Sequence, residues 1–257
     1  MLKIILFIVC LYFVSCSPTD STNNERLNRL EMVAKTLMSD TTLAEDGIDA
    51  VPAGANNNAI QIMWYTHNDV DRLKSFRIYR STDPQGEVNY NSIATLEILN
   101  KFNQDTVYID QELETDRPYY YFVTVIDKDS RESLPSDTVW YTLLPKAEPQ
   151  SPSGSIDTPD EINYVFRVPS DAIPNGYILR IEREVGANFI ELVYLEKVEP
   201  FNDFGEQFVT HTLAGDTVRA LFADDLTYRW RVDLIAGDAL YSGSESDWET
   251  FSVNWGN

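Results

Sequence analysis

Histidine and cysteine are the rarest residues in this chain that can do metal-binding or acid–base chemistry, with two of each. His67 and His211 are the only two histidines among 257 residues. Two imidazoles can bind a metal ion together. These two fall in separate copies of the strand pattern described below, His67 just after one strand and His211 within another. A shared site would have to bridge two domains, so both are interpreted as surface or strand residues and no metal is expected.

Closely spaced acidic residues are the second group that could form a functional site, because carboxylates bind calcium. The chain contains 41 Asp and Glu residues, so neighbouring acids in turns are expected by chance. No pair belongs to the Asp-x-Asp-x-Asp-Gly run of a calcium loop. Solvated loops are therefore favoured over calcium sites. The pairs in question are Asp69 with Asp71, Asp127 with Asp129, and Asp224 with Asp225.

Catalytic motifs are not found in the sequence. A glycosidase needs two carboxyls held about 5–10 Å apart in a cleft, whereas the strand pattern predicts modules with convex loops. The chain has no Gly-x-Ser-x-Gly motif and no phosphate-binding Gly-rich loop. The sequence therefore predicts a non-enzyme without a cofactor. A small hydrolase on an unrecognised fold stays as an alternative.

The N-terminus reads MLKIILFIVCLYFVSC, and Cys16 is its chemically important residue. Lys3 provides a positive start, and Ile4 to Val14 form an apolar run of about eleven residues. A membrane-spanning helix needs about 20 residues. The shorter run is typical of a secretory signal peptide.

Phe13-Val14-Ser15-Cys16 resembles the lipobox of bacterial lipoproteins, with Phe13 in place of the usual leucine. The resemblance implies removal of residues 1–15, acylation (palmitate) at Cys16 and a membrane as partner. Several acyl chains anchor a protein firmly. Ser17 resembles the residue found in outer-membrane cargo, which implies a cell-envelope location with the leaflet undecided. A plain signal peptide or an uncleaved anchor remains open.

Cysteine usage and charge exclude other classes. Cys10 would leave with the signal peptide, so the mature chain would have no thiol for a disulfide. The net charge is −21. A nucleic-acid partner is not expected, because binding DNA or RNA needs a cationic surface. Hydrophobic residues make up 43% of the chain, which indicates packed domains.

The stretch before the first strands predicts a helix over 23–38. Apolar residues recur with helical spacing from Leu27 to Met38, and Thr22 with Glu25 fits a capping box. Residues 16–47 are therefore interpreted as a lipidated tether with an amphipathic helix. The helix either docks on the next domain or contacts a partner or lipid.

From Ala59 the periodicity changes to alternation. AIQIMWYT, SFRIYRS and PYYYFVTVID each place apolar or aromatic residues at every second position. Turn residues such as Asp83-Pro84-Gln85-Gly86 separate such runs. This pattern predicts half-buried antiparallel strands, and short strands spaced this way are typical of a sandwich.

Residues 48–144 resemble a fibronectin type III domain. Trp64 occupies the place of that family's strand-B tryptophan, and FRIYRS matches its strand C. Leu113 precedes Tyr119 by six residues, the spacing of the family's tyrosine corner. The resemblance implies that the Tyr119 hydroxyl bonds a nearby backbone group while its ring fills the core.

Residues 145–257 repeat the template about 101 to 109 residues later. Tyr228 corresponds to Tyr119, while Phe166 replaces the tryptophan and the middle, 186–215, is weakly patterned. The stretch PKAEPQSPSGS is interpreted as a semi-stiff connector. The predicted fold class is all-β: two tandem fibronectin type III-like β-sandwiches preceded by a lipoprotein signal peptide and one short α-helix.

The expected function is non-catalytic display of two modules that bind an envelope or extracellular protein or a glycan, since sandwich loops can vary on a stable core. Candidate contacts lie in three loops: 67–73, 127–135 and 236–245. An accessory subunit of polysaccharide uptake or degradation is the alternative, with Trp140, Trp248 or Trp255 stacking on sugar rings. The candidate binding residues are His67, Asp69, Asp71, Asp127, Asp129 and Asp238.

Overall fold

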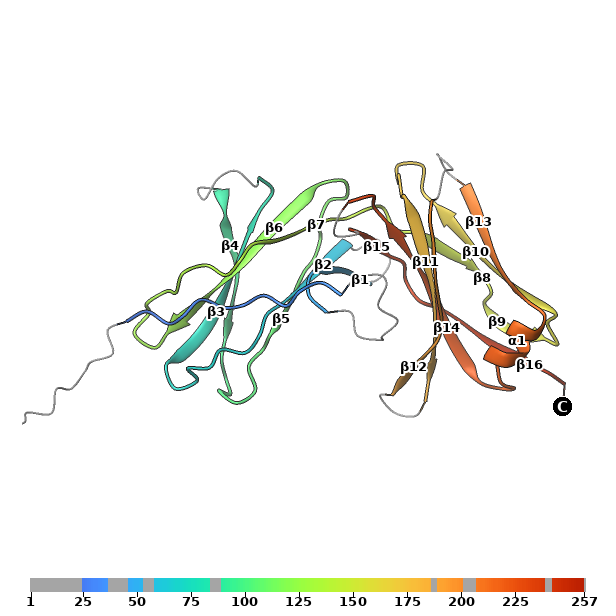
Figure 1. Cartoon of the computed structure of the whole chain (residues 1–257), viewed down its shortest axis with the longest axis horizontal. Coiled ribbons are helices and arrows are strands. Elements are labelled where there is room, and N and C mark those ends of the chain that lie inside the picture. Colours follow the sequence, from blue (N-terminus) through green and yellow to red (C-terminus); the bar gives the residue numbers. More distant parts are fainter. Residues whose placement is uncertain are drawn as a thin grey trace, which may run out of the picture.

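The computed structural model describes residues 25–36, 46–52, 58–83, 89–185, 189–200, 207–238 and 242–256. Strands make up nearly all of its regular structure, and the one helix in these ranges is α1 (Asp216–Leu221). The predicted all-β class is therefore confirmed. No helix in the described ranges is long and apolar enough to cross a membrane. The strands form two halves that follow one another along the chain (Figure 1), each with its own hydrophobic core.

The N-terminal half consists of two antiparallel sheets. One has the order β1-β2-β5 and the other the order β4-β3-β6-β7. The strands are β1 (Asp49–Pro52), β2 (Asn58–Met63), β3 (Leu73–Ser81), β4 (Asn91–Glu97), β5 (Val107–Asp110), β6 (Pro118–Asp127) and β7 (Val139–Thr142). The predicted strands over 75–81 and 118–127 are thus present as β3 and β6.

Alternation explains how these strands share a core. Phe76 and Ile78 of β3 and Tyr121 and Val123 of β6 are fully buried, and they meet Trp64 from the end of β2. The Trp64 and Phe76 rings contact edge to face, with centroids 5.5 Å apart. Because successive strand residues point to opposite faces, the intervening side chains lie on the outer face of the sheet.

The segment 25–36 is extended, so the predicted helix over 23–38 is wrong for every described residue of that range. Met32 pairs with Trp64 at the end of β2, and the Val33 amide donates to the Met63 carbonyl at 3.0 Å. Leu27 and Leu30 are buried in the core. Backbone partners at the edge of β2 and burial of two leucines together outweigh the local helical preference.

Thr36 and Asp46 lie next to one another on either side of 37–45, which is outside the described residues. The Thr36 amide donates to the Asp46 carbonyl at 3.0 Å. Gly47 then adopts a φ of +85°, and a Cβ there would lie 2.6 Å from the Ala34 carbonyl oxygen. A side chain does not fit at Gly47, because both the backbone conformation and the space exclude it.

The C-terminal half also has two sheets. One has the order β13-β10-β8 and the other the order β12-β11-β14-β16-β9, with β15 paired to β14. The strands are β8 (Glu148–Ser151), β9 (Gly154–Asp157), β10 (Glu161–Val168), β11 (Gly176–Glu184), β12 (Ile190–Val198), β13 (Gln207–Ala214), β14 (Thr227–Ile235), β15 (Gly243–Glu245) and β16 (Glu249–Asn254). The weakly patterned stretch 186–215 supplies β12 and β13.

The second core follows the same alternation. Tyr164 and Phe166 of β10 and Trp230 of β14 are fully buried. The Tyr164 and Trp230 rings contact edge to face at 5.2 Å between centroids. The connector contributes to this half, since β8 pairs with β10 and β9 pairs with β16 in parallel.

The two halves join through backbone contacts between the connector and β15. The Leu144 amide donates to the Gly243 carbonyl at 3.1 Å, and the Ser244 hydroxyl donates to the Pro145 carbonyl at 3.0 Å. A Cβ on Gly243 would lie 1.9 Å from the Leu234 carbonyl oxygen. The junction therefore depends on glycine at this position.

Candidate functional site

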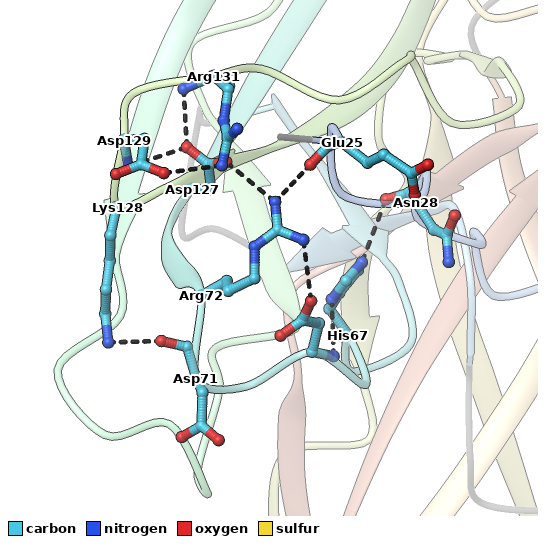
Figure 2. A network of polar contacts seen from close by, with 10 residues as sticks. Glu25, Asn28, His67, Asp71, Arg72, Asp127, Lys128, Asp129 and Arg131 are labelled. Carbon is cyan, nitrogen blue, oxygen red and sulfur yellow. Dashed lines mark hydrogen bonds and ion pairs between the residues drawn. The ribbon is translucent and has the colours of Figure 1, made fainter. Parts of the chain in front are cut away.

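The candidate loop residues of the N-terminal half lie together at the pole where the described chain begins. The contacts among residues 67–72, 127–131, Lys101 and Gln104 form what we call the polar loop network. Arg72 lies at its centre and reaches Glu25 of the N-terminal segment (Figure 2). Arg72 also forms ion pairs of 3.4 Å with Asp69 and with Asp127. One guanidinium thus connects the loop after β2, the turn after β6 and the N-terminal segment.

Asp127 is the buried acid of the network. Its carboxylate accepts the amides of Asp129 at 3.0 Å and Arg131 at 2.8 Å, and it also accepts the Arg131 side chain at 2.8 Å. Burial alone would raise the pKa of this carboxyl, but the hydrogen bonds from Arg131 and Asp129 hold that pKa below its usual value. Asp127 closes the turn after β6.

His67 is engaged at both ring nitrogens. Nε2 lies 3.1 Å from the Asn28 carbonyl, and Nδ1 accepts the Asp69 amide at 3.1 Å. The backbone of His67 is held in turn by the Gln104 side chain, at 2.9 Å through each of its amide and carbonyl groups. A carbonyl beside Nε2 and an amide donor beside Nδ1 match the tautomer that carries its proton on Nε2.

The two outermost acids of the network pair with cations. Asp71 accepts the Lys101 ammonium at 2.5 Å, and this hydrogen bond lowers the pKa of the Asp71 carboxyl. Asp129 accepts Arg131 at 2.7 Å. Within the described residues, no group of three or more His, Cys, Asp or Glu is arranged to hold a metal ion. The network joins three loops to one another.

The remaining sequence candidates lie in the C-terminal half, away from this network. Asp238 accepts the amide of Ser242, the residue before β15, at 2.9 Å. His211 of β13 lies 3.2 Å from the Tyr177 hydroxyl and 3.4 Å from a Glu196 oxygen. Burial lowers the pKa of His211. The two histidines therefore occupy separate halves and do not share a site.

Both candidate structural tyrosines bond a backbone amide near the start of their strand. The Tyr119 hydroxyl accepts the Glu114 amide at 2.9 Å, and the Tyr228 hydroxyl accepts the Ala223 amide at 2.7 Å. Both rings are buried. The two halves use the same contact at equivalent places.

An outer aromatic surface covers the β4-β3-β6-β7 sheet, and sequence reasoning missed most of it. Its rings are partly exposed and come from β3, β6, β7 and the residue before β4; they are Tyr79, Tyr90, Tyr120, Phe122 and Trp140. Phe122 contacts Tyr79 and Tyr90, with both centroid distances at 4.7 Å. Tyr120 lies 6.4 Å from Trp140. The rings form a broad aromatic face on the side opposite the core.

Glu132 borders this surface and fixes its polar edge. Its carboxylate accepts the Tyr79 hydroxyl at 2.7 Å, the Thr124 hydroxyl at 2.6 Å and Arg77 at 3.0 Å. A hollow of about 340 Å³ lies beside it; its lining includes Arg26, Tyr90, Phe122 and Pro135. An apolar face with a fixed hydrogen-bonding edge suits a ligand that has both an apolar surface and polar groups.

A second hollow, of about 630 Å³, lies at the connector. Lys146 lines it together with Arg167, Asp171 and Trp248. The Lys146 Nζ is buried, with no hydrogen-bond partner in the described chain and Asp247 at 3.9 Å, and burial lowers its pKa. Because that ammonium is shielded from solvent, a ligand in the hollow would not reach it.

Arginine side chains lie over the rings of two of the three tryptophans considered for sugar contact. The guanidiniums of Arg229 and Arg231 lie 4.2 and 4.8 Å from the centroid of the Trp248 ring. Trp255 lies under Arg219 and donates to the Phe222 carbonyl at 3.0 Å. Trp140 instead belongs to the outer aromatic surface.

Comparison with known proteins gives no family. Neither a protein-family model nor a curated protein matches the sequence. Matching solved structures include a β-1,2-glucanase from Parabacteroides distasonis, 29% identical with a TM-score of 0.28, over 39% of this chain and 13% of that one. Pectate lyase PelI from Erwinia chrysanthemi is 16% identical with a TM-score of 0.28, over 43% and 33%. The chain thus spans about a third or less of the length of these structures.

Proposed function

We propose that this chain is a lipid-anchored protein of the bacterial envelope whose two fibronectin type III-like modules bind a protein or a glycan without catalysis. The signal-like N-terminus ending in Ser15-Cys16 supports the anchor. Paired sheets of three and four strands in the N-terminal half support the module assignment, as do the amide contacts of Tyr119 and Tyr228. Cys16 itself lies outside the described residues.

The outer aromatic surface is the observation that carries the binding role. A sheet face exposed to water normally carries polar residues opposite the core. Here it carries five aromatic rings, and contiguous exposed apolar surface marks interaction sites. Tyr79 and Tyr90 already pack on Phe122, so these partly buried rings lose little conformational freedom on binding, which favours affinity. The charged side chains of the loops, by contrast, form ion pairs with one another.

Replacing Trp140 with alanine is expected to weaken ligand binding at least about tenfold, because aromatic residues are frequent hot spots. The measurement is binding of the purified protein to a glycan array and to intact-cell envelope proteins. Ile109→Ala is the matched control, since Ile109 is exposed on the other sheet. Equal binding by both variants would remove the outer aromatic surface from the proposal.

The anchor has its own test. Cys16→Ala is expected to abolish incorporation of labelled palmitate and to release the protein from the membrane fraction. The physical reason is that the acylated sulfur would be the attachment point. Continued labelling of the variant, or an unmodified Cys16 in mass spectra of the native protein, would contradict the lipid anchor while leaving the binding surface intact.

An accessory role in polysaccharide uptake or degradation is the second candidate. The position of Trp140 beside Tyr120, 6.4 Å apart, favours it because flat rings can stack on the apolar faces of sugars. The net charge of −21 would favour neutral over anionic glycans. A glycan array without any signal above the Trp140→Ala background would dismiss this candidate and leave a protein ligand.

A further inference from the structure

The described chain begins at one pole of the N-terminal half, and contacts hold it there. Arg72 donates to the Glu25 carbonyl, and the His67 ring lies 3.1 Å from the Asn28 carbonyl. Figure 1 shows the N-terminal segment starting at the end of the molecule farthest from the C-terminal half. The tether therefore joins the fold at this pole.

The length of the tether limits how far this pole can stand from a membrane. Nine residue steps separate Cys16 from Glu25. At 3.3–3.6 Å per residue, they span at most about 32 Å when fully extended. A lipid on Cys16 would thus keep the polar loop network within roughly the thickness of one bilayer from the membrane surface.

The same pole presents two exposed apolar side chains, with the Lys101 ammonium 5.0 Å from the centroid of the Phe102 ring. Leu99 is 96% exposed and Phe102 is 81% exposed, the highest values among the large hydrophobic residues of the described chain. Their turn is fixed by the Asn100 side chain, which accepts the Phe102 amide at 3.0 Å. The Lys101 bond to Asp71 and the Gln104 bonds to His67 attach this turn to the polar loop network.

The charges within the polar loop network are compensated, while Asp105, in the same loop as Phe102, adds an exposed acid beside it. Each aspartate of the polar loop network pairs with a cation: Asp69 with Arg72, Asp71 with Lys101, and Asp127 and Asp129 with Arg131. Lys74 and Lys128 are also exposed there. In a chain of net charge −21, this pole is thus suited to approach phosphate headgroups, whereas unpaired carboxylates would be repelled.

We propose that the turn 99–102, the apical turn, enters the headgroup–acyl boundary of the membrane that holds Cys16. This inference rests on the lipid anchor of the proposed function. Leu99 and Phe102 bury their side chains among lipids, and the neighbouring lysines contact phosphates, as interfacial segments do. The N-terminal half then stands on this pole, with the outer aromatic surface facing sideways along the membrane.

Single cysteines test the orientation. Phe102→Cys and Phe208→Cys are labelled with an environment-sensitive dye in the lipidated protein, in vesicles of phosphatidylethanolamine with a minority of phosphatidylglycerol. Phe208 is the matched control, an exposed phenylalanine on β13 of the other half. We expect a blue shift and a several-fold loss of iodide quenching at position 102 but not at position 208. Both residues are exposed, so neither change threatens the fold.

The unchanged protein separates the two ways of failing. Its only other cysteine, Cys10, leaves with the signal peptide, so an acylated Cys16 leaves no thiol for the dye. Dye uptake by the unchanged protein would overturn the lipid anchor. No such uptake, together with equal quenching at positions 102 and 208 in vesicle-bound protein, would overturn the membrane contact of the apical turn alone.

Discussion

Replacing Arg231 with methionine is expected to lower the free energy of unfolding by about 3–5 kcal/mol, the typical effect of removing one partner of a buried ion pair. Arg231 lies on the outer face of β14 but is buried. Its guanidinium pairs with Asp233 at 2.9 Å and with Glu245 at 2.5 Å. Methionine would remove the guanidinium that both buried carboxylates share. Equilibrium urea unfolding followed by circular dichroism measures the change.

Arg117→Met is the control for this experiment. Arg117 pairs with Glu114 at 2.9 Å, but both side chains are exposed. Exposed pairs contribute about 0–1 kcal/mol, so this variant is expected to unfold close to the parent. Adding Glu245→Gln to Arg231→Met should recover part of the loss, because one buried negative charge is removed together with the positive charge that it contacted. Equal midpoints for Arg231→Met and Arg117→Met would show that the buried carboxylates do not need Arg231.

Replacing Leu30 with alanine is expected to destabilise the N-terminal half by about 2–5 kcal/mol, as for other leucines truncated in cores. Leu30 is only 3% exposed and packs in the first core. A leucine in a helical spacer would give almost no loss. Urea unfolding again gives the magnitude; its fluorescence signal sums five tryptophans, of which Trp64 and Trp140 lie in the N-terminal half.

Asn28→Ala is the matched control, because Asn28 lies in the same segment with an exposed side chain. Its contact with His67 uses the backbone carbonyl, which the substitution keeps. The two variants should therefore differ by most of the Leu30 effect. If they unfolded at the same urea concentration, the segment 25–36 would not be part of the core.

The strands and their inward faces could be predicted because alternation is a local signal. Phe76 and Ile78 are separated by Arg77, and only the apolar phase is buried. Tyr164 and Phe166 repeat this relation in the second half. In each case a period of two residues decides which side chains meet the facing sheet.

The segment 25–36 shows where a local signal failed. Its apolar spacing fits a helix, and nothing nearby in the sequence indicates that the end of β2 extends beyond β1 and can pair with a further segment. The pairing of Met32 with Trp64 joins residues more than thirty positions apart. Such a contact depends on the completed sheet, so it overrides a propensity that acts over one or two turns.

The outer aromatic surface had a signal that alternation alone did not use. PYYYFVTVID carries aromatic rings in both phases, with Tyr119 and Tyr121 inward and Tyr120 and Phe122 outward. An ordinary half-buried strand would have polar residues in the outward phase. Tyr90 and Trp140 join from other strands, and their place depends on register, which the sequence does not encode locally.

For the candidate loop acids, the sequence indicated the loops but not the partners of the side chains. Their loops were predicted from their place between expected strands. Asp71, Asp127 and Asp129 lie at one pole (Figure 2), where Asp69 pairs with Arg72. Their partners could not be predicted, because Arg72 reaches Asp127 across 55 positions. The pairing depends on the packing of separate loops rather than on spacing within one of them.

The antiparallel contact of the N-terminal segment with β2 has a mechanical consequence. A tension applied through the chain before Glu25 would act along this segment, parallel to the strand direction. The bonds from Val33 to Met63 and from Tyr65 to Glu31, each 3.0 Å, would then be loaded together in shear. Strands sheared lengthwise must break several bonds at once, whereas strands peeled apart break them in turn. A force applied to the tether would thus be resisted by these hydrogen bonds together.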